Sequence, residues 1–381
     1  MILLFVSFFS SLLLILGFIR YKHLHEHFSG DHDLNGPQKI HQGSVPRIGG
    51  LGIYAAMWIA NLVAYLKDPA LGIFLGLILI AAFPVSATGL TEDITKRIGV
   101  KIRLLAGFIS GALLLYLFTI TSIRIDVWGL DALFLNVWVA VIFLCAACAG
   151  LANAYNIIDG FNGLASMVGI ISTAAIAVVA FKVGDLALVY LALILIGAVM
   201  GIFNWNYPRG LVFLGDGGAY LIGFVIAALS ILIVHRNPSV SPWFALLVNA
   251  YPIFETLFTI WRRSVHQGKN PGLPDGAHFH SLIYRRVLRW AHVMDQQSAT
   301  TQEPHHHYLN NAKTSPYLWL ISSIGVIPAL LFWQSTPLLI TSLILFVAIY
   351  LYCYSTIVQL RRPWWLGSPP PEIDKSSKNS F

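Results

Sequence analysis

The chain has 381 residues, of which 57% are hydrophobic and only 11% are charged, and its formal net charge is +7. So little charge does not cover the surface of a water-soluble protein of this length. Apolar runs recur at about the 20-residue length that a helix needs to cross a bilayer. The composition therefore excludes an ordinary soluble protein and predicts an all-α, polytopic bundle of membrane helices.

Eleven apolar runs are candidate membrane spans. In chain order they cover residues 2–19, 48–66, 71–89, 104–121, 136–152, 164–181, 186–203, 217–234, 242–260, 317–334 and 338–358. The first run has neither a basic leader nor a cleavage signature, which indicates an uncleaved span rather than a signal peptide. We expect one transmembrane domain over residues 1–360 and a disordered cytoplasmic tail over residues 361–381.

The basic residues predict the orientation of these spans. All but four of the 24 lysines and arginines lie in alternate connections, which are also the connections rich in motifs. The exceptions are Lys67, Arg124, Lys182 and Arg236. Because basic loops stay in the cytoplasm, the N-terminus is predicted outside and the C-terminus inside. The positive charge thus flanks membrane lipid, and no nucleic-acid partner is expected.

Three cysteines, Cys145, Cys148 and Cys353, lie inside apolar runs. The first two have a CxxC spacing, but no second pair or histidine cluster accompanies them. Buried free thiols are therefore expected, rather than a disulfide framework, a redox pair or a zinc site.

The first predicted cytoplasmic loop ends in basic and glycine residues at the start of a span. Asp33, Lys39, His41 and Arg47 precede Gly49-Gly50. Arginine makes forked contacts to phosphate, and glycines let a backbone approach an anion where a helix begins. The alternative is that these cations only anchor the span at the lipid headgroups.

Acidic residues follow at two further span ends. Glu92 and Asp93 come directly after an apolar run, and Asp216 stands among glycines at the mouth of another. Carboxylates at a membrane edge are costly unless they are solvated, paired or bound to a cation. The pair is a candidate Mg²⁺ site or general base, and Asp216 a candidate Mg²⁺ ligand. Helix capping is the alternative.

Two more polar segments complete the candidate site. The stretch from residue 153 to 163 contains Asn153, Asn156, Asp159 and Asn162, and a glycine-broken turn that caps the next helix is its alternative reading. A later loop contains Asp275, His278, His280 and Arg285. No third ligand stands at zinc spacing there, which favours phosphate binding.

Two other polar features are less informative. The run His305-His306-His307 is expected in a solvated loop without helix. Glu255, a carboxylate inside the ninth span, is either a site residue or a group paired within the bundle. Because the acids, histidines and arginines of the rich loops share one membrane face, the pattern favours phosphoryl transfer with Mg²⁺.

The motifs resemble a known family. They are KIHQGSVPRIGG, GLTEDITKRIGVKIRLL, NAYNIIDGFNGL, FLGDGGAYLIGF and PDGAHFHSLIYRR. In this order they resemble the polyprenyl-phosphate N-acetylhexosamine-1-phosphate transferases, a branch of glycosyltransferase family 4. Eleven spans with a cytoplasmic C-terminus look like the N-acetylglucosamine-type branch. Phospho-MurNAc-pentapeptide translocase activity is the alternative, and a membrane transporter or a non-catalytic scaffold fits less well, because no inverted repeat is seen and the acids gather at one face.

The resemblance implies an enzyme that transfers HexNAc-1-phosphate from a UDP-HexNAc to undecaprenyl phosphate and releases UMP. It implies a bacterial cytoplasmic (inner) membrane protein whose site faces the cytoplasm, and a product that starts a lipid-linked surface glycan such as O-antigen. Mg²⁺, with Mn²⁺ as a substitute, would be the cofactor, and a homodimer is a possible assembly.

The resemblance also implies roles. Asp93 would be the base on the lipid phosphate with Glu92 beside it, Asp159 would act in the nucleotide-sugar loop, Asp216 would hold Mg²⁺, and His278 would act on the diphosphate or sugar. The expected substrate-binding residues are Asp33, Lys39, His41, Arg47, Asn153, Asn156, Asn162, Asp275, His280 and Arg285.

Three residues depart from the family pattern: Glu92, Asn162 and Ser281 stand where relatives place Asp, Asp and His. The sequence does not identify the sugar, and it leaves open whether the lipid phosphate attacks directly or through a covalent intermediate.

Overall fold

The computed structural model describes residues 1–23, 45–268, 277–288 and 306–359. Within these residues the chain is helical and forms no strand, which confirms the predicted all-α class. The long helices are α1 Ile2–Arg20, α3 Gly49–Lys67, α4 Pro69–Thr95, α5 Val100–Leu117, α6 Val137–Ile158, α7 Leu164–Lys182, α8 Leu186–Asn206, α9 Gly215–Arg236, α14 His306–Phe332 and α15 Thr336–Gln359. The short ones are η1 Asp131–Leu135, α10 Pro242–Val248, α11 Ala250–Trp261, η2 Arg262–His266, α12 Phe279–Leu282 and η3 Ile283–Leu288.

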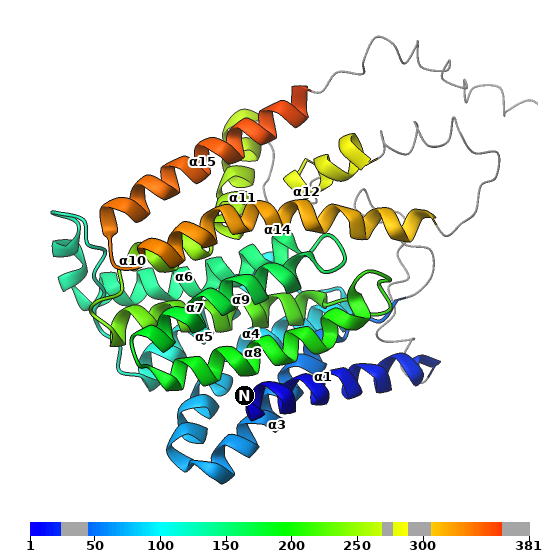
Figure 1. Ribbon diagram of the computed structural model, residues 1–381, viewed down its shortest axis with the longest axis horizontal. Helices are drawn as coiled ribbons and strands as arrows, with labels where there is room; N and C mark the ends of the chain where they lie inside the picture. The colour runs from blue at the N-terminus through cyan, green and yellow to red at the C-terminus, as the bar shows by residue number, and fades with distance from the viewer. Residues whose placement is uncertain (24–44, 269–276, 289–305, 360–381) are drawn as a thin grey trace, which may run out of the picture.

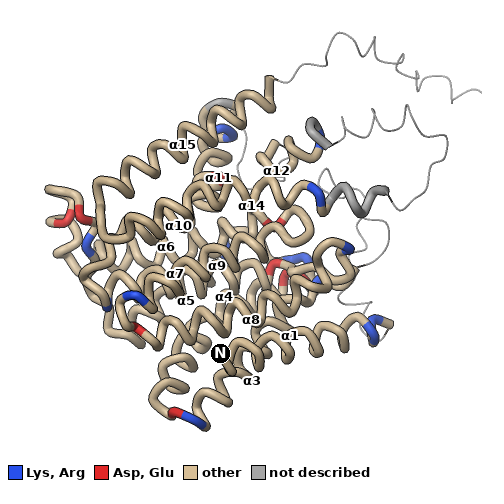
Figure 2. The backbone as a smooth tube through the Cα atoms, in the orientation of Figure 1, with Lys and Arg blue, Asp and Glu red and all other residues tan. Residues whose placement is uncertain are grey.

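Ten of the helices in the described residues are long and apolar enough to cross a membrane. An eleventh span exists if the bent pair Pro242–Val248 and Ala250–Val265 is counted as one. The prediction of about eleven spans is therefore confirmed by length and composition. Figure 2 shows the charged residues mainly at the ends of the helices, with long uncharged stretches between them.

The ninth span differs from its prediction as a continuous helix over residues 242–260. It bends by 74° between α10 and α11, at Asn249. The side chain of Asn249 is fully buried, and its amide nitrogen donates to the Ala245 carbonyl at 3.0 Å and to Ser230 Oγ at 3.3 Å. Such an interruption is tolerated in a membrane where protein satisfies the freed polar groups. In Figure 1, α11 accordingly turns away from the direction of the neighbouring helices.

Several helices extend beyond their predicted ends. Helix α4 runs to Thr95, so Glu92 and Asp93 lie on its last turns rather than in a loop. Helix α6 runs to Ile158, and α14 begins at His306, within the run expected to be a helix-free loop. The predicted boundaries followed hydropathy, which marks where the apolar stretch ends but not where the backbone hydrogen bonds of the helix end.

Helix α9 forms the centre of the bundle. Of its most apolar stretch, 94% is buried, and it packs against α4, α6, α3 and α7 (Figure 1). Helices α1 and α3 lie on one side of the molecule, and α14 and α15 on the other. The cysteines of α6, Cys145 and Cys148, are buried and free, as expected; Cys353 is also free but only partly buried, contrary to the expectation of a buried thiol.

Glycines bring α3 and α4 against the beginning of α9. A Cβ added to Gly50 would lie 2.2 Å from the backbone nitrogen of Gly218, and one added to Gly89 would lie 2.7 Å from Cα of Gly217. Side chains larger than hydrogen at these positions would hold the backbones apart. Three helices therefore meet backbone to backbone at the point where α9 begins.

Candidate functional site

Asp93 holds the N-terminus of α9. Its Oδ1 accepts the backbone N–H of Asp216 and its Oδ2 accepts that of Gly217, both at 2.9 Å. The first N–H groups of a helix have no partner within the helix, so a carboxylate there satisfies them. Asp93 is only 3% exposed and reaches these groups because glycines let α4 approach α9. Both of its oxygens thus fix the backbone that carries Asp216.

Two arginines surround the carboxylate of Asp216. Arg103 of α5 is bound to Oδ2 of Asp216, and Nη2 of Arg47 lies 3.7 Å from Oδ1. Nε of Arg47 also lies 3.7 Å from Oδ1 of Asp93. Arg103 further lies over the ring of Tyr220, with 5.8 Å between its guanidinium carbon and the ring centroid. Segments before α3, in α4, in α5 and in α9 thus converge on one charged cluster, which we call the Asp216 cluster (Arg47, Asp93, Arg103 and Asp216).

Asp159 lies close to the Asp216 cluster, in the turn after α6. Burial raises the pKa of its carboxyl to about 8; Arg47 opposes that rise, while Asp216 and Asp93 add to it. A carboxyl with such a pKa is mainly protonated at neutral pH. Without a bound cation, Asp159 therefore adds little negative charge to the Asp216 cluster.

Glu92 has a local contact next to the cluster. Its Oε2 accepts the backbone N–H of Ile98 at 2.5 Å, which ties the end of α4 to the connection that leads into α5. The carboxylate is partly exposed, in contrast to that of Asp93. The side chain of Glu92 thus reaches the backbone six residues ahead, in the α4–α5 connection.

The three predicted asparagines separate into different environments. Asn153 Oδ1 accepts the hydroxyl of Tyr220 at 3.3 Å, next to Arg103, and Asn156 lies one turn further along α6, partly buried. Asn162 is 3% exposed, and its amide nitrogen donates to the Pro208 carbonyl at 3.1 Å. The Asn162 carbonyl in turn accepts the hydroxyl of Ser315 in α14. Asn162 thus joins three segments of the chain.

The two predicted histidines stack on each other. The rings of His278 and His280 have centroids 5.1 Å apart and an angle of 14° between planes, and both residues are buried. His280 also meets the Asp159 turn, because its ring packs on the edge of Phe161 at 5.4 Å. Arg285 is exposed on η3. The histidine segment therefore lies against the turn that carries Asp159.

Four predicted site residues, Asp33, Lys39, His41 and Asp275, lie outside the described residues. The expectations for them remain predictions.

Sequence reasoning did not single out Arg103. Lys101 and Arg103 are two residues apart, and residues at this spacing lie on different sides of a helix. The structure leaves Lys101 exposed and directs Arg103 to Asp216. Arg103 could have been found by starting the fourth span at Val100, its observed start, and asking which residues share a face of that helix.

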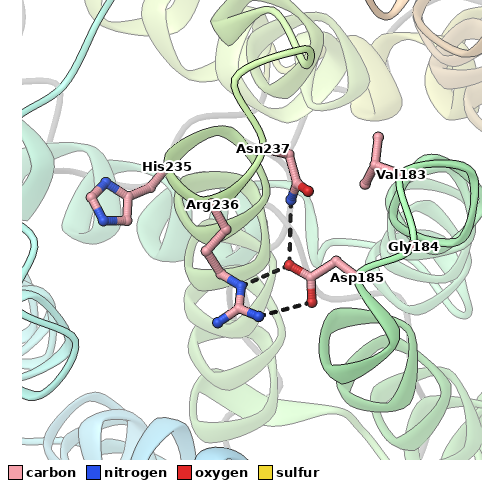
Figure 3. A pocket seen from close by; sticks show the side chains of 6 residues that line it. All are labelled: Val183, Gly184, Asp185, His235, Arg236 and Asn237. Carbon is pink, nitrogen blue, oxygen red and sulfur yellow. Dashed lines mark hydrogen bonds and ion pairs between the residues drawn. The ribbon is translucent and has the colours of Figure 1, made fainter.

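Two cavities of about 420 Å³ within the described residues lie away from this cluster. One of about 420 Å³ opens at the other end of α9, which at about 1.5 Å per residue is roughly 30 Å from Asp216. It is lined by Val183, Gly184, Asp185, His235, Arg236 and Asn237 (Figure 3). Arg236 donates to both oxygens of Asp185, at 2.7 and 3.2 Å, and Asn237 donates at 3.3 Å, while His235 points away. These partners bind one another and tie α8 to α9, so the charged groups of this cavity are already paired.

The Asp216 cluster fits a divalent cation that keeps few protein ligands. Within the described ranges no three acidic, histidine or cysteine side chains form a ready metal cage. Mg²⁺ typically takes one or two carboxylates and completes its shell with water and substrate phosphates. Asp216 and Asp159 are the carboxylates at this end of the bundle that would hold such an ion.

Comparison with known proteins agrees with this geometry. The profile of glycosyl transferase family 4 matches residues 75–234, which run from within α4 to near the end of α9 and include Asp93, Arg103 and Asp216. The chain is 28% identical to a probable undecaprenyl-phosphate N-acetylglucosaminyl 1-phosphate transferase of Bacillus subtilis, covering 65% of this chain and 67% of the relative.

Two further relatives carry the name undecaprenyl-phosphate alpha-N-acetylglucosaminyl 1-phosphate transferase. The protein of Thermotoga maritima is 25% identical over 66% of this chain and 72% of its own length. That of Escherichia coli strain K12 is 27% identical over 65% of this chain and 67% of its own. The chain is thus similar to glycosyl transferase family 4 over residues 75–234, and to these transferases over about two thirds of its length.

Proposed function

We propose that the protein transfers a HexNAc-1-phosphate from a UDP-HexNAc to undecaprenyl phosphate and releases UMP. In the net reaction the bond between the β-phosphorus and the oxygen that bridges to the α-phosphorus breaks, and this oxygen leaves with UMP. A bond forms between the β-phosphorus and a phosphate oxygen of the lipid. The observation that carries the proposal is the Asp216 cluster, four charged side chains from four segments at one end of a membrane bundle.

Phosphoryl transfer requires positioning and charge neutralisation more than covalent chemistry by the protein. Arg47 and Arg103 supply the positive charge that a diphosphate and a lipid phosphate need when they meet. Arginine suits this role because its fork binds two phosphate oxygens at once. Asp93 keeps the start of α9, and with it Asp216, in place relative to these cations.

We further propose that Mg²⁺ assists, held by Asp216 and Asp159 together with substrate phosphates. When bound, the ion would neutralise charge on the diphosphate. The carboxylates of Asp216 and Asp159 would contribute the oxygen ligands that Mg²⁺ prefers, and a bound cation would favour the ionised form of Asp159, whose pKa burial raises.

The proposed setting is a bacterial cytoplasmic membrane with the Asp216 cluster on the cytoplasmic side, where UDP-sugars are found. Basic loops at that end of the helices support this orientation. The lipid-linked product would begin a surface glycan such as O-antigen.

The activity is tested with purified protein, undecaprenyl phosphate, Mg²⁺ and a panel of UDP-HexNAc donors, with UMP and the lipid product measured together. We expect UMP release with at least one donor, loss in Asp216→Asn, and loss on chelation of the metal. Arg103→Gln should reduce activity strongly, whereas its exposed neighbour on α5, in Lys101→Gln, serves as the matched control and should retain it. Absence of UMP release from every donor would refute the proposal.

A further inference from the structure

A buried carboxylate outside the Asp216 cluster is bound by three donors from distant parts of the chain. Glu255 of α11 is 1% exposed. Its Oε1 accepts the backbone N–H of Phe279 at 3.1 Å and lies 3.1 Å from Nδ1 of His278, and its Oε2 accepts the hydroxyl of Tyr350 in α15. A buried carboxylate is costly unless its oxygens are paired in this way. Because both carboxylate oxygens have partners, Glu255 is held in one orientation.

The contact with Glu255 fixes the state of the His278 ring. A carboxylate at Nδ1 favours the tautomer with the proton on Nδ1, which leaves Nε2 as the nitrogen that accepts or transfers a proton. Thr259 Oγ1 also lies 3.3 Å from Nδ1 and so belongs to the same side of the ring. The Nδ1 edge of His278 is therefore occupied by protein.

The position of His278 connects this network to the proposed active site. His278 stacks on His280, and a Cβ added to Gly160 would lie 2.8 Å from Nε2 of His280. Gly160 directly follows Asp159 in the chain. A chain of contacts thus runs from Tyr350 through Glu255 and the two histidines to the Asp159 turn.

We propose that Glu255 is a positioning residue for His278: held by Tyr350, it keeps His278 in the Nδ1–H tautomer, so that Nε2 meets the phosphates or the sugar of the substrate. This assignment of Nε2 rests on the proposed transferase function. The tautomer itself and its dependence on Glu255 do not, because they are properties of the protein without substrate.

The first test is independent of activity. In protein labelled with ¹⁵N-histidine, the resonances of His278 are identified by their loss in His278→Gln, and their shifts report the tautomer. We expect Nδ1–H in the unaltered protein and a change of that signal in Glu255→Gln. An Nε2–H tautomer in the unaltered protein, or no change in Glu255→Gln, would overturn the proposal.

The second test is kinetic. We expect Glu255→Gln to lower kcat by about 10- to 100-fold, as loss of a residue that orients a functional histidine typically does. Tyr350→Phe should lower kcat by about 10-fold. The matched control is Tyr354→Phe, whose hydroxyl donates at 3.2 Å to the Ala277 carbonyl from the same helix as Tyr350. It should retain nearly full kcat.

A double-mutant cycle separates positioning from general destabilisation. If Glu255 acts through His278, Glu255→Gln should have almost no further effect on kcat in a His278→Gln background. Losses that multiply, together with equal falls in thermal stability for Tyr350→Phe and Tyr354→Phe, would overturn the positioning role. Wild-type protein with the expected tautomer but no UMP release would instead count against the proposed function alone.

Discussion

At the scale of single residues, Asn162 is the departure from relatives with the clearest physical explanation. Its amide nitrogen donates to the carbonyl of Pro208, and its own carbonyl accepts from Ser315. An ionised Asp has no hydrogen to donate. The side-chain amide of Asn162 therefore ties the Asp159 turn to the segment before α9, while its backbone carbonyl, which an Asp would keep, makes the contact with α14. Its predicted role in substrate binding remains a prediction.

The first prediction is that Asn162→Asp lowers stability. The new carboxylate would face the Pro208 carbonyl in a buried site, and an unsatisfied buried polar group costs about 1–3 kcal/mol. The melting temperature of the purified protein should fall. Asn153→Asp is the matched control, because Asn153 accepts from Tyr220 and a carboxylate also accepts. An unchanged melting temperature with increased UMP release in Asn162→Asp would show that position 162 faces substrate instead.

The second prediction uses the pKa of Asp159. Burial raises the pKa of Asp159 from 3.8 to about 8 in the folded, metal-free protein. Between pH 4 and pH 8, Asp159 is therefore protonated in the folded protein but ionised in the unfolded chain. The stability that the protonated Asp159 carboxyl contributes is therefore fully present below about pH 4. It is lost as pH rises through about 8, because unfolding then releases this proton. Asp159→Asn should remove this loss.

The measurement is thermal unfolding of metal-free protein from pH 4 to pH 9. Asp159→Asn and the unaltered protein should have similar melting temperatures near pH 4, and the variant should become the more stable one as pH approaches 8. A difference that does not depend on pH would contradict the pKa assigned to Asp159.

At the scale of elements, the site depends on how closely α4 approaches the start of α9. Asp93 reaches the N–H groups of Asp216 and Gly217 because Gly89, one helical turn earlier in α4, has no side chain to hold α9 away. Glycine contacts between α3 and α9, at Gly50 and Gly218, repeat the arrangement. The close packing of α4 against α9 thus also sets the positions of the charged groups.

The third prediction is that Gly89→Ala destabilises the protein by about 1–3 kcal/mol, as forced overpacking does. Its Cβ would lie 2.7 Å from Cα of Gly217, so α9 must shift and UMP release should fall as well. Gly150→Ala in α6 is the control, since no atom lies within 4 Å of its added Cβ. Equal melting temperatures for the two variants would show that the close approach of α4 and α9 is not required.

At the scale of the whole molecule, the two ends of the bundle differ in character. One end gathers the Asp216 cluster, Asp159 and the stacked histidines. The other carries the ion pair of Asp185 and Arg236 that links α8 to α9. The distribution of lysine and arginine predicts that the first end faces the cytoplasm.

The fourth prediction concerns this orientation. A fluorescent protein fused after Phe381 should fold and fluoresce in a bacterial host, whereas an alkaline phosphatase fused there should be inactive. A phosphatase fused after Lys182, at the α7–α8 connection, should be active, because that connection belongs to the opposite end. Reversed activities would refute the predicted topology.

The amino-acid sequence was enough to predict the fold class and the membrane spans, and it predicted the end of the bundle at which the candidate site residues gather. Length and hydropathy of the runs are enough for the spans, because a bilayer requires apolar helices of a fixed minimum length. The resemblance carried by Glu92-Asp93, Asp159 and Asp216 identified the family that the comparisons support. These features are local in the chain or tied to short motifs.

The contacts between polar groups, by contrast, could be seen only in the folded protein. Asp93 and Asp216 are 123 residues apart in the chain, and Glu255 and Tyr350 are 95 apart, so no periodicity reports their contacts. The bend at Asn249 likewise depends on Ser230 and Tyr155 of other helices. Hydropathy describes how each helix meets lipid, but the glycine contacts between backbones decide how helices meet one another, and in this protein those contacts place the charges.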